Sequence, residues 1–249
     1  MKKTSLTNVC LEILSKEINL QRIPGFEAIE SVKLASGADG GGISLYNGEK
    51  IGKVTVADFS YGNGAPITHR QDRIGMTAEL FQIMPDFSYK LPVWGIDSVL
   101  FEDGTYWFDT DFFFGFDLVN DYDFVMKYLD PFNEVYEKFF NNKDIKILSM
   151  AEVTTWVRTH ISLCYIIAEL PLAKVDAVYE LASELIKVWM RMYNDAERQD
   201  ESFKKSQIKR ITSMYGKMKN EERMAEILCD VYGKKTFAKL FQAIMPNFV

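Results

Sequence analysis

Hydrophobic and polar residues alternate in short runs over the first half of the chain, a pattern typical of β-strands. The two clearest runs, Val93–Phe101 and Thr105–Phe113, are separated only by Glu102-Asp103-Gly104. Gly104 can adopt the positive φ that a short turn requires, so the two runs predict a β-hairpin. Further strands are expected at Ala28–Ala35, Ile43–Tyr46, Ile51–Ser60 and Thr77–Pro85, with a tight turn at Asn47-Gly48 and a loop over Ser60–Arg73.

Beyond Phe113 the hydrophobic residues recur every three or four positions, which is typical of helices that bury one face. A similar spacing over Thr4–Leu20 predicts an N-terminal helix, with Thr4 or Ser5 as its N-cap. Strands followed by helices favour an α+β fold, in which helices cover an antiparallel sheet. The later helices are expected at Asp121–Leu129, Phe132–Phe140, Met150–Leu170, Val175–Tyr193, Ser206–Lys219, Glu221–Tyr232 and Lys235–Ile244.

Composition limits the class of protein. The 249 residues are 47% hydrophobic, enough for a full core, and without a linker or repeat we expect a single domain over 1–249, as a monomer. The formal charge of −6 disfavours a nucleic-acid-binding protein. Three scattered cysteines favour a reduced, cytoplasmic protein. The sequence shows neither a signal peptide nor an apolar run long enough to span a membrane.

Asp97 is the residue that hydrophobic burial leaves unexplained. It stands between Ile96 and Ser98 inside an apolar strand. An ionised carboxylate is costly to bury, so such a side chain needs partners or keeps its proton. Two interpretations follow: a group that takes part in acid–base chemistry, or a hairpin Asp that is hydrogen-bonded to neighbouring backbone.

A longer motif surrounds Asp97. After Pro85, the run Leu91-Pro92-Val93-Trp94-Gly95-Ile96-Asp97-Ser98-Val99 resembles the LPxxGxDxV signature of ferredoxin-dependent bilin reductases. Asp111 also stands where those enzymes have an Asp at the end of the next strand. The resemblance covers the chain from about residue 51, and plant red chlorophyll catabolite reductases are distant relatives of the same fold. The C-terminus is similar to the family's tail through Asn220, Arg223, Tyr232-Gly233, Phe237-Ala238 and Met245-Pro246.

The resemblance implies a three-layer α/β/α sandwich with a central antiparallel β-sheet. An open-chain tetrapyrrole such as biliverdin would bind between the sheet and the C-terminal helices. The family binds no metal or flavin; ferredoxin or flavodoxin supplies electrons singly, and the protein supplies protons. The expected function is therefore reduction of a bilin. The alternatives are a reductase of another open-chain tetrapyrrole, such as a chlorophyll catabolite, and a tetrapyrrole-binding protein without catalysis.

Two carboxyls are the expected catalytic residues. Asp97 matches the family's aspartate that protonates the bilin. Asp58 falls where the family has a second acidic residue, usually Glu; two carboxyls in one pocket would have separated pKa values, giving a donor and a relay. The alternative for Asp58 is a strand-end Asp exposed to solvent. Leu80 replaces the family's catalytic His, and His69 either enters the site from its loop or stays solvated.

The expected substrate contacts are more scattered. Arg223 and Asn220 are similar to family residues that meet the bilin, and an Arg suits a propionate through paired hydrogen bonds. Arg158 is a second propionate candidate. Asp111 and Trp94 complete the expected contacts, although an aromatic residue in a strand is also ordinary core.

Basic residues gather late in an otherwise acidic chain. Lys204, Lys205 and Lys209 belong to one predicted helix. Such a group is often only a solvated helix face. It is also what docking of an acidic ferredoxin would need, because electrostatic steering depends on local charge. We expect docking here.

Overall fold

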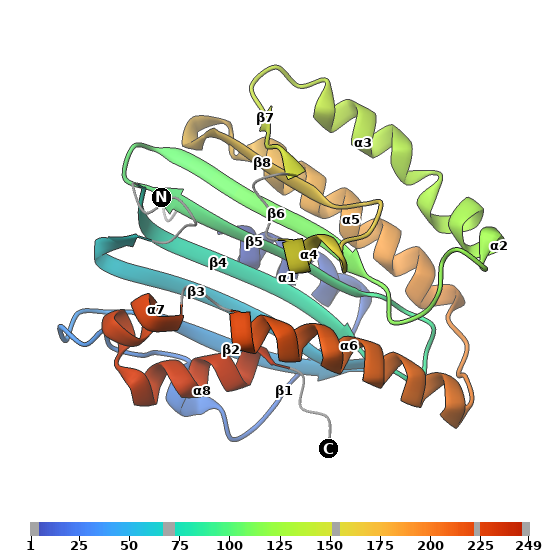
Figure 1. The fold of residues 1–249 in the computed structure, drawn as a ribbon, viewed down its shortest axis with the longest axis horizontal. Coiled ribbons are helices and arrows are strands. Elements are labelled where there is room, and N and C mark those ends of the chain that lie inside the picture. Colours follow the sequence, from blue (N-terminus) through green and yellow to red (C-terminus); the bar gives the residue numbers. More distant parts are fainter. Residues whose placement is uncertain (1–4, 67–72, 151–154, 222–224, 246–249) are drawn as a thin grey trace.

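The described residues of the computed structural model, 5–66, 73–150, 155–221 and 225–245, form one eight-stranded sheet. Every pair of neighbouring strands is antiparallel, in the order β1-β2-β3-β4-β5-β6-β8-β7 (Figure 1). The strands are β1 (Gln21–Arg22), β2 (Gly41–Gly48), β3 (Ile51–Pro66), β4 (Ile74–Pro85), β5 (Val93–Phe101), β6 (Thr105–Phe113), β7 (Lys146–Ile147) and β8 (Ile166–Pro171).

Helices cover both faces of this sheet, which confirms the expected α+β fold. A short π-helical turn over Val125–Leu129 continues α2. The helices are α1 (Leu6–Glu17), α2 (Tyr122–Phe124), α3 (Phe132–Phe140), α4 (Thr155–Arg158), α5 (Asp176–Asp195), α6 (Glu201–Glu221), α7 (Ala225–Tyr232) and α8 (Lys234–Ile244).

The largest core lies on what we call the back face of the sheet, the face against α1, α3 and α5. Helix α1 starts where Ser5 caps it, because the Ser5 hydroxyl accepts a hydrogen bond from the Asn8 amide. Helix α5 buries a long stripe that includes Trp189, whose indole donates to the Pro92 carbonyl at 3.0 Å. The stripe fixes α5 against the strand that carries Asp97.

The front face, toward α6, α7 and α8, carries two smaller cores (Figure 1). Helices α7 and α8 pack over β2 and β3. Lys53 of β3 supports this layer, because its ammonium donates to the last carbonyls of α8, at 2.7 Å for Ala243. Helix α6 packs through Met214 and Tyr215 on Met84 and Val93. The C-terminal helices therefore cover one side and one end of this face.

Two predicted segments differ from the structure. Met150–Leu170 does not form one helix: the short α4 is followed by β8, which pairs with β6. Its apolar residues suit a buried strand as well as a helix, and the neighbouring strand decides between them. Ala28–Ala35 does not form a strand either. This segment is a loop that begins with a 3₁₀ turn, and it packs on the sheet through the buried side chains of Ile29, Val32 and Leu34.

Two turns are also displaced. The β2–β3 turn is centred on Glu49 and Lys50 rather than Asn47-Gly48, because Gly48 pairs with Ile51. Lys50 takes a positive φ of 55° and donates to the carbonyls of Tyr193 and Ala196, which holds the turn against the end of α5. The predicted loop after Ser60 is partly strand, since β3 continues past a bulge to Pro66.

Candidate functional site

Asp97 lies on the front face of the sheet, in the middle of a row of residues that cross three strands. In register, it stands between Leu80 of β4 and Asp109 of β6. Successive side chains of a strand point to opposite faces. Trp94 and Ile96 therefore belong to the core on the back face, whereas Asp97 points toward the C-terminal helices.

Part of this front face is not fully covered. Leu80, Asp97, Asp109 and Trp107 are only half-buried, although they belong to central strands of the sheet. Leu80 packs at the margin of the core that α7 and α8 complete over β2 and β3, and Trp107 packs against Leu148, Tyr165 and Ile167. Helix α6 covers the far ends of β4 and β5. We call Leu80, Asp97, Asp109 and Trp107 the open stretch. It combines apolar surface with carboxyl groups, as a site for a flat, largely apolar ligand requires.

Asp109 was missed by the sequence-based prediction. The sequence does contain a signal for it. A turn at 102–104 puts Phe101 across from Thr105, and four residues further from the turn on each strand Asp97 stands opposite Asp109. The Tyr165 hydroxyl donates to Asp109 Oδ2 at 3.1 Å. The site therefore contains two facing carboxyls from adjacent strands.

Asp111 lies on the same face as Asp109 but is 2% exposed. Its carboxylate accepts hydrogen bonds from the Ser162 hydroxyl at 2.5 Å and the Ser162 amide at 2.8 Å. Burial, with a smaller contribution from the charge of Asp109, raises the pKa of Asp111 to about 7. Asp111 thus fixes the segment before β8 to the site, and its burial argues against the predicted direct contact with substrate.

Tyr165 is a second buried polar group of this site, at 9% exposure. Burial raises its pKa, and the charges of Asp109, Asp97 and Asp111 raise it further. The phenol therefore stays protonated and remains a hydrogen-bond donor to Asp109. These three carboxyls therefore lie close enough together for their charges to affect the same phenol.

Asp58 does not share this site, which corrects the expected pairing with Asp97. It lies on the back face, where its Oδ1 accepts a hydrogen bond from the Thr7 hydroxyl at 2.7 Å. The neighbouring Glu79 accepts from the Thr7 amide at 3.3 Å, and burial raises the pKa of Glu79 to about 7. Both acids thus meet the first turn of α1. The reason is strand parity, since Ala57 rather than Asp58 lies in the row of Leu80 and Asp97.

Trp94 likewise does not lie on the face that carries Asp97. It is 0% exposed on the back face, where it packs on Phe81 and donates its indole N–H to Thr110 at 3.1 Å. Trp94 and Asp97 are three positions apart in one strand, so they face opposite sides of the sheet. Trp107 is the tryptophan of the open stretch.

The remaining predicted residues are spread over the C-terminal half. Arg158 is exposed at the end of α4 and donates to Thr155 at 3.1 Å. Lys205 and Lys209 are exposed on α6, and Lys204 is half-buried. His69, Arg223 and the side chain of Asn220 lie outside the described residues.

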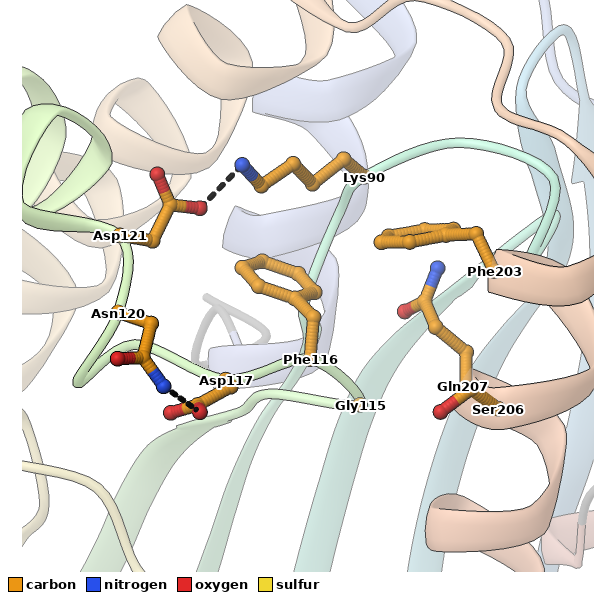
Figure 2. Close-up of a pocket in the computed structure, with 9 residues that line it drawn as sticks. All are labelled: Lys90, Gly115, Phe116, Asp117, Asn120, Asp121, Phe203, Ser206 and Gln207. Atoms are coloured by element: carbon orange, nitrogen blue, oxygen red, sulfur yellow. Dashed lines mark hydrogen bonds and ion pairs between the residues drawn. The ribbon is translucent and has the colours of Figure 1, made fainter.

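A separate cavity of about 430 Å³ lies between the start of α6 and the segment after β6 (Figure 2). Its polar groups are largely paired with one another: Lys90 with Asp121, and Asn120 with Asp117 at 2.6 Å. Gln207 donates its amide hydrogens to the carbonyls of Phe87 and Tyr89. None of the residues that line the cavity belongs to the open stretch, so we assign the cavity no part in the chemistry.

Within the described part of the chain, no group of three His, Cys, Asp or Glu side chains has the arrangement of a metal site. The same residues include no helix that is long and apolar enough to cross a membrane.

Comparison with known proteins supports the fold. No protein-family model and no curated protein matches the chain. Among solved structures, it is similar to phytochromobilin synthase from tomato, which was crystallised in complex with biliverdin. The TM-score is 0.75 at 14% sequence identity, over 96% of this chain and 82% of that chain. At this identity the similarity establishes the fold alone, and that fold is the one expected from the motif around Asp97.

Proposed function

We propose that this protein is an oxidoreductase that reduces a linear tetrapyrrole such as biliverdin, with ferredoxin or flavodoxin as its one-electron donor. One observation carries the proposal: Asp97, the acid of the LPxxGxDxV motif, lies in the open stretch of the front face. The fold of the chain is that of a protein crystallised with biliverdin.

Asp97 is the proposed proton donor. Saturating one double bond takes two electrons and two protons, and a donor that delivers single electrons leaves a substrate radical between the two steps. A carboxyl among apolar groups and beside a second carboxyl resists ionisation, so it can keep a proton to give. Asp97 has both neighbours, Leu80 on one side and Asp109 on the other.

The open stretch is the proposed binding surface for the tetrapyrrole. Leu80 and Trp107 supply apolar surface for flat pyrrole rings. The propionates need a cation, and Arg158 and Arg223 remain the proposed partners. Asn220 is proposed to meet the bilin beside Arg223.

Helix α6 is the proposed docking surface for the electron donor. Its Lys205 and Lys209 are exposed one helical turn apart, so their charges lie side by side on the outer surface. A local basic surface steers an acidic partner even when the net charge of the protein is negative.

An anaerobic assay tests the function directly. Purified protein is mixed with biliverdin and reduced ferredoxin, and the absorbance is followed. Reduction shortens the conjugated system, so we expect the long-wavelength band to shift to shorter wavelength with turnover, and no shift when ferredoxin is omitted. Biliverdin that binds but is never reduced would favour a protein that only shelters the pigment. Turnover restricted to a linear chlorophyll catabolite would favour the related reductase.

A further inference from the structure

The inference starts from Asp109, a residue outside the LPxxGxDxV motif. Asp109 and Asp97 are directly opposite in the β5–β6 pair and point to the same face. Opposite residues of antiparallel strands have Cβ atoms about 4.5–5.5 Å apart, within reach for two carboxyls to share a proton directly or through one water. Two like charges at this separation would repel each other, and protons on the two carboxyls would remove that repulsion.

Asp109 is also held in place from outside its own hairpin. Tyr165, which precedes β8, donates its hydroxyl to Asp109 Oδ2 at 3.1 Å. Asp111, two residues along β6, is fixed by Ser162, so the segment that carries Tyr165 is fixed to β6 at two points. A donor that stays protonated stabilises the Asp109 carboxylate after a proton has left it.

We propose that Asp109 is a positioning residue that returns a proton to Asp97 between the two protonations of the substrate. This inference rests on the proposed function. The first electron from ferredoxin or flavodoxin and the proton of Asp97 convert the tetrapyrrole into a neutral radical. The Asp109 carboxyl then passes its proton to the Asp97 carboxylate. The second electron and this proton complete the reduced bond, and the two carboxyls then regain their two protons from water, with Asp109 passing one of them to Asp97.

The position of Asp109 suits each step of this sequence. Asp97 becomes an anion when it protonates the substrate, and a neutral acid beside it relieves that charge. Asp109 is half-buried, so water can reach it to replace the proton. Its titratable neighbours include Asp97 on β5, Asp111 on β6 and Tyr165 ahead of β8.

Single-turnover reduction of bound biliverdin tests the relay, with absorbance and electron spin resonance as readouts. For Asp109→Asn we expect unchanged biliverdin affinity and an unchanged first absorbance phase. The second phase should be slower by ~10²-fold, the scale of losing a positioned proton source, and a radical should accumulate before it. For Tyr165→Phe we expect a smaller slowing of the same phase.

Two controls make the test decisive. Glu102→Gln removes a carboxylate from the exposed turn of the same hairpin and should leave both phases unchanged. Asp97→Asn should block the first phase, because Asp97 gives the substrate its first proton. If Asp109→Asn does not fold, as shown by thermal unfolding, Tyr165→Phe decides the question alone.

Three results would overturn the relay while leaving the proposed function intact. They are wild-type rates in both phases, loss of the first phase in Asp109→Asn, and loss of biliverdin binding in Asp109→Asn. With Tyr165→Phe as the deciding variant, an unchanged second phase would have the same meaning. If the wild-type protein binds biliverdin but never reduces it, the proposed function is overturned, and the relay with it.

Discussion

At the scale of single residues, Asp97 and Asp58 show how one position changes the chemistry open to a carboxyl. Both lie in apolar strands, yet Asp97 faces Asp109 on the front face and Asp58 faces α1 on the back face. The amide and hydroxyl of Thr7 satisfy Glu79 and Asp58, respectively. We therefore assign Glu79 and Asp58 to the start of α1, and Asp97 remains the proposed proton donor.

Replacing Asp97 by Asn should keep bilin binding and nearly abolish turnover. The amide has nearly the shape of the acid, but it cannot donate an acidic proton, a loss that typically costs ~10²–10⁴-fold in rate. Steady-state kcat and the dissociation constant for biliverdin separate the two effects. Asp123→Asn, an exposed acid of α2, is the matched control. Wild-type turnover in Asp97→Asn would assign the proton to another group.

The raised pKa of Glu79 predicts that the stability of the folded protein depends on pH. Its pKa is raised to about 7 in the folded protein, from an ordinary value of 4.5. Between these pH values the folded state holds a proton that the unfolded state has released, so the free energy of unfolding falls as pH rises from about 4.5 to 7.

Glu79→Gln should remove this loss, because the amide oxygen can still accept from Thr7 and carries no charge. At pH 8 we expect the variant to gain on the order of 1–3 kcal/mol over the wild type, from the free energy that one pKa unit represents. At pH 4 the two proteins should be nearly equal. Urea unfolding at both pH values measures the difference, and an equal effect at both would assign it to packing.

At the scale of elements, α6 has one face that packs on the sheet and another that carries exposed basic residues. Its inner face buries Gln207, Ile211, Met214 and Tyr215, while Lys205 and Lys209 are exposed on its outer face. The packing of the inner face on β4 and β5 fixes where the basic residues lie relative to the site. The proposed docking surface and the sheet that carries the open stretch are thus connected through α6.

Reversing charge on α6 should weaken the reaction with ferredoxin. For Lys205→Glu with Lys209→Glu we expect a several-fold higher KM for ferredoxin at low salt and a flatter salt dependence, since steering between opposite charges is lost. The KM for biliverdin should not change. Lys235→Glu with Lys239→Glu on α8 makes the same change of charge elsewhere. Equal effects of both double variants would point to net charge rather than to docking on α6.

One hydrogen bond ties α6 to the sheet below the site. Gln82 of β4 donates to the Tyr215 hydroxyl at 2.7 Å in the buried layer between them. Tyr215→Phe leaves a buried donor unpaired and should lower the free energy of unfolding by about 1–3 kcal/mol. Denaturant unfolding measures this loss. Tyr122→Phe, an exposed tyrosine of α2, should have no effect, and a similar loss there would contradict this assignment.

At the scale of the whole molecule, the two helical layers differ in what they leave uncovered. The back layer closes over the largest core, whereas the front layer leaves the open stretch half-buried in the centre of the sheet. A ligand that fills this stretch binds the folded state only. Its binding free energy must therefore add to stability.

Biliverdin should raise the thermal unfolding temperature of the protein. At a ligand concentration of about 100 times the dissociation constant, the gain is about 2.7 kcal/mol for one site. We also expect the purified protein to be colourless, without stoichiometric flavin or metal, and its unfolding temperature to be unchanged by EDTA. Calorimetry and absorbance spectra test both statements. No shift with biliverdin would contradict the proposed site.

The sequence by itself determined those features that depend on neighbours along the chain. Both strands of the central hairpin have the predicted bounds, and so does Phe132–Phe140, because alternation and helical spacing are local properties. The same alternation was sufficient to place Trp94 and Asp97 on opposite faces. The hairpin register was sufficient to place Asp109 opposite Asp97.

The tertiary structure decided what depends on distant parts of the chain. Ile166–Pro171 becomes a strand because β6 offers it an edge, and Asp58 meets α1 because that helix packs on its side of the sheet. No residue pattern within a strand says which face the C-terminal helices will cover. That choice follows from the packing of whole layers, and it leaves Asp97 and Asp109 half-buried while it buries Asp111.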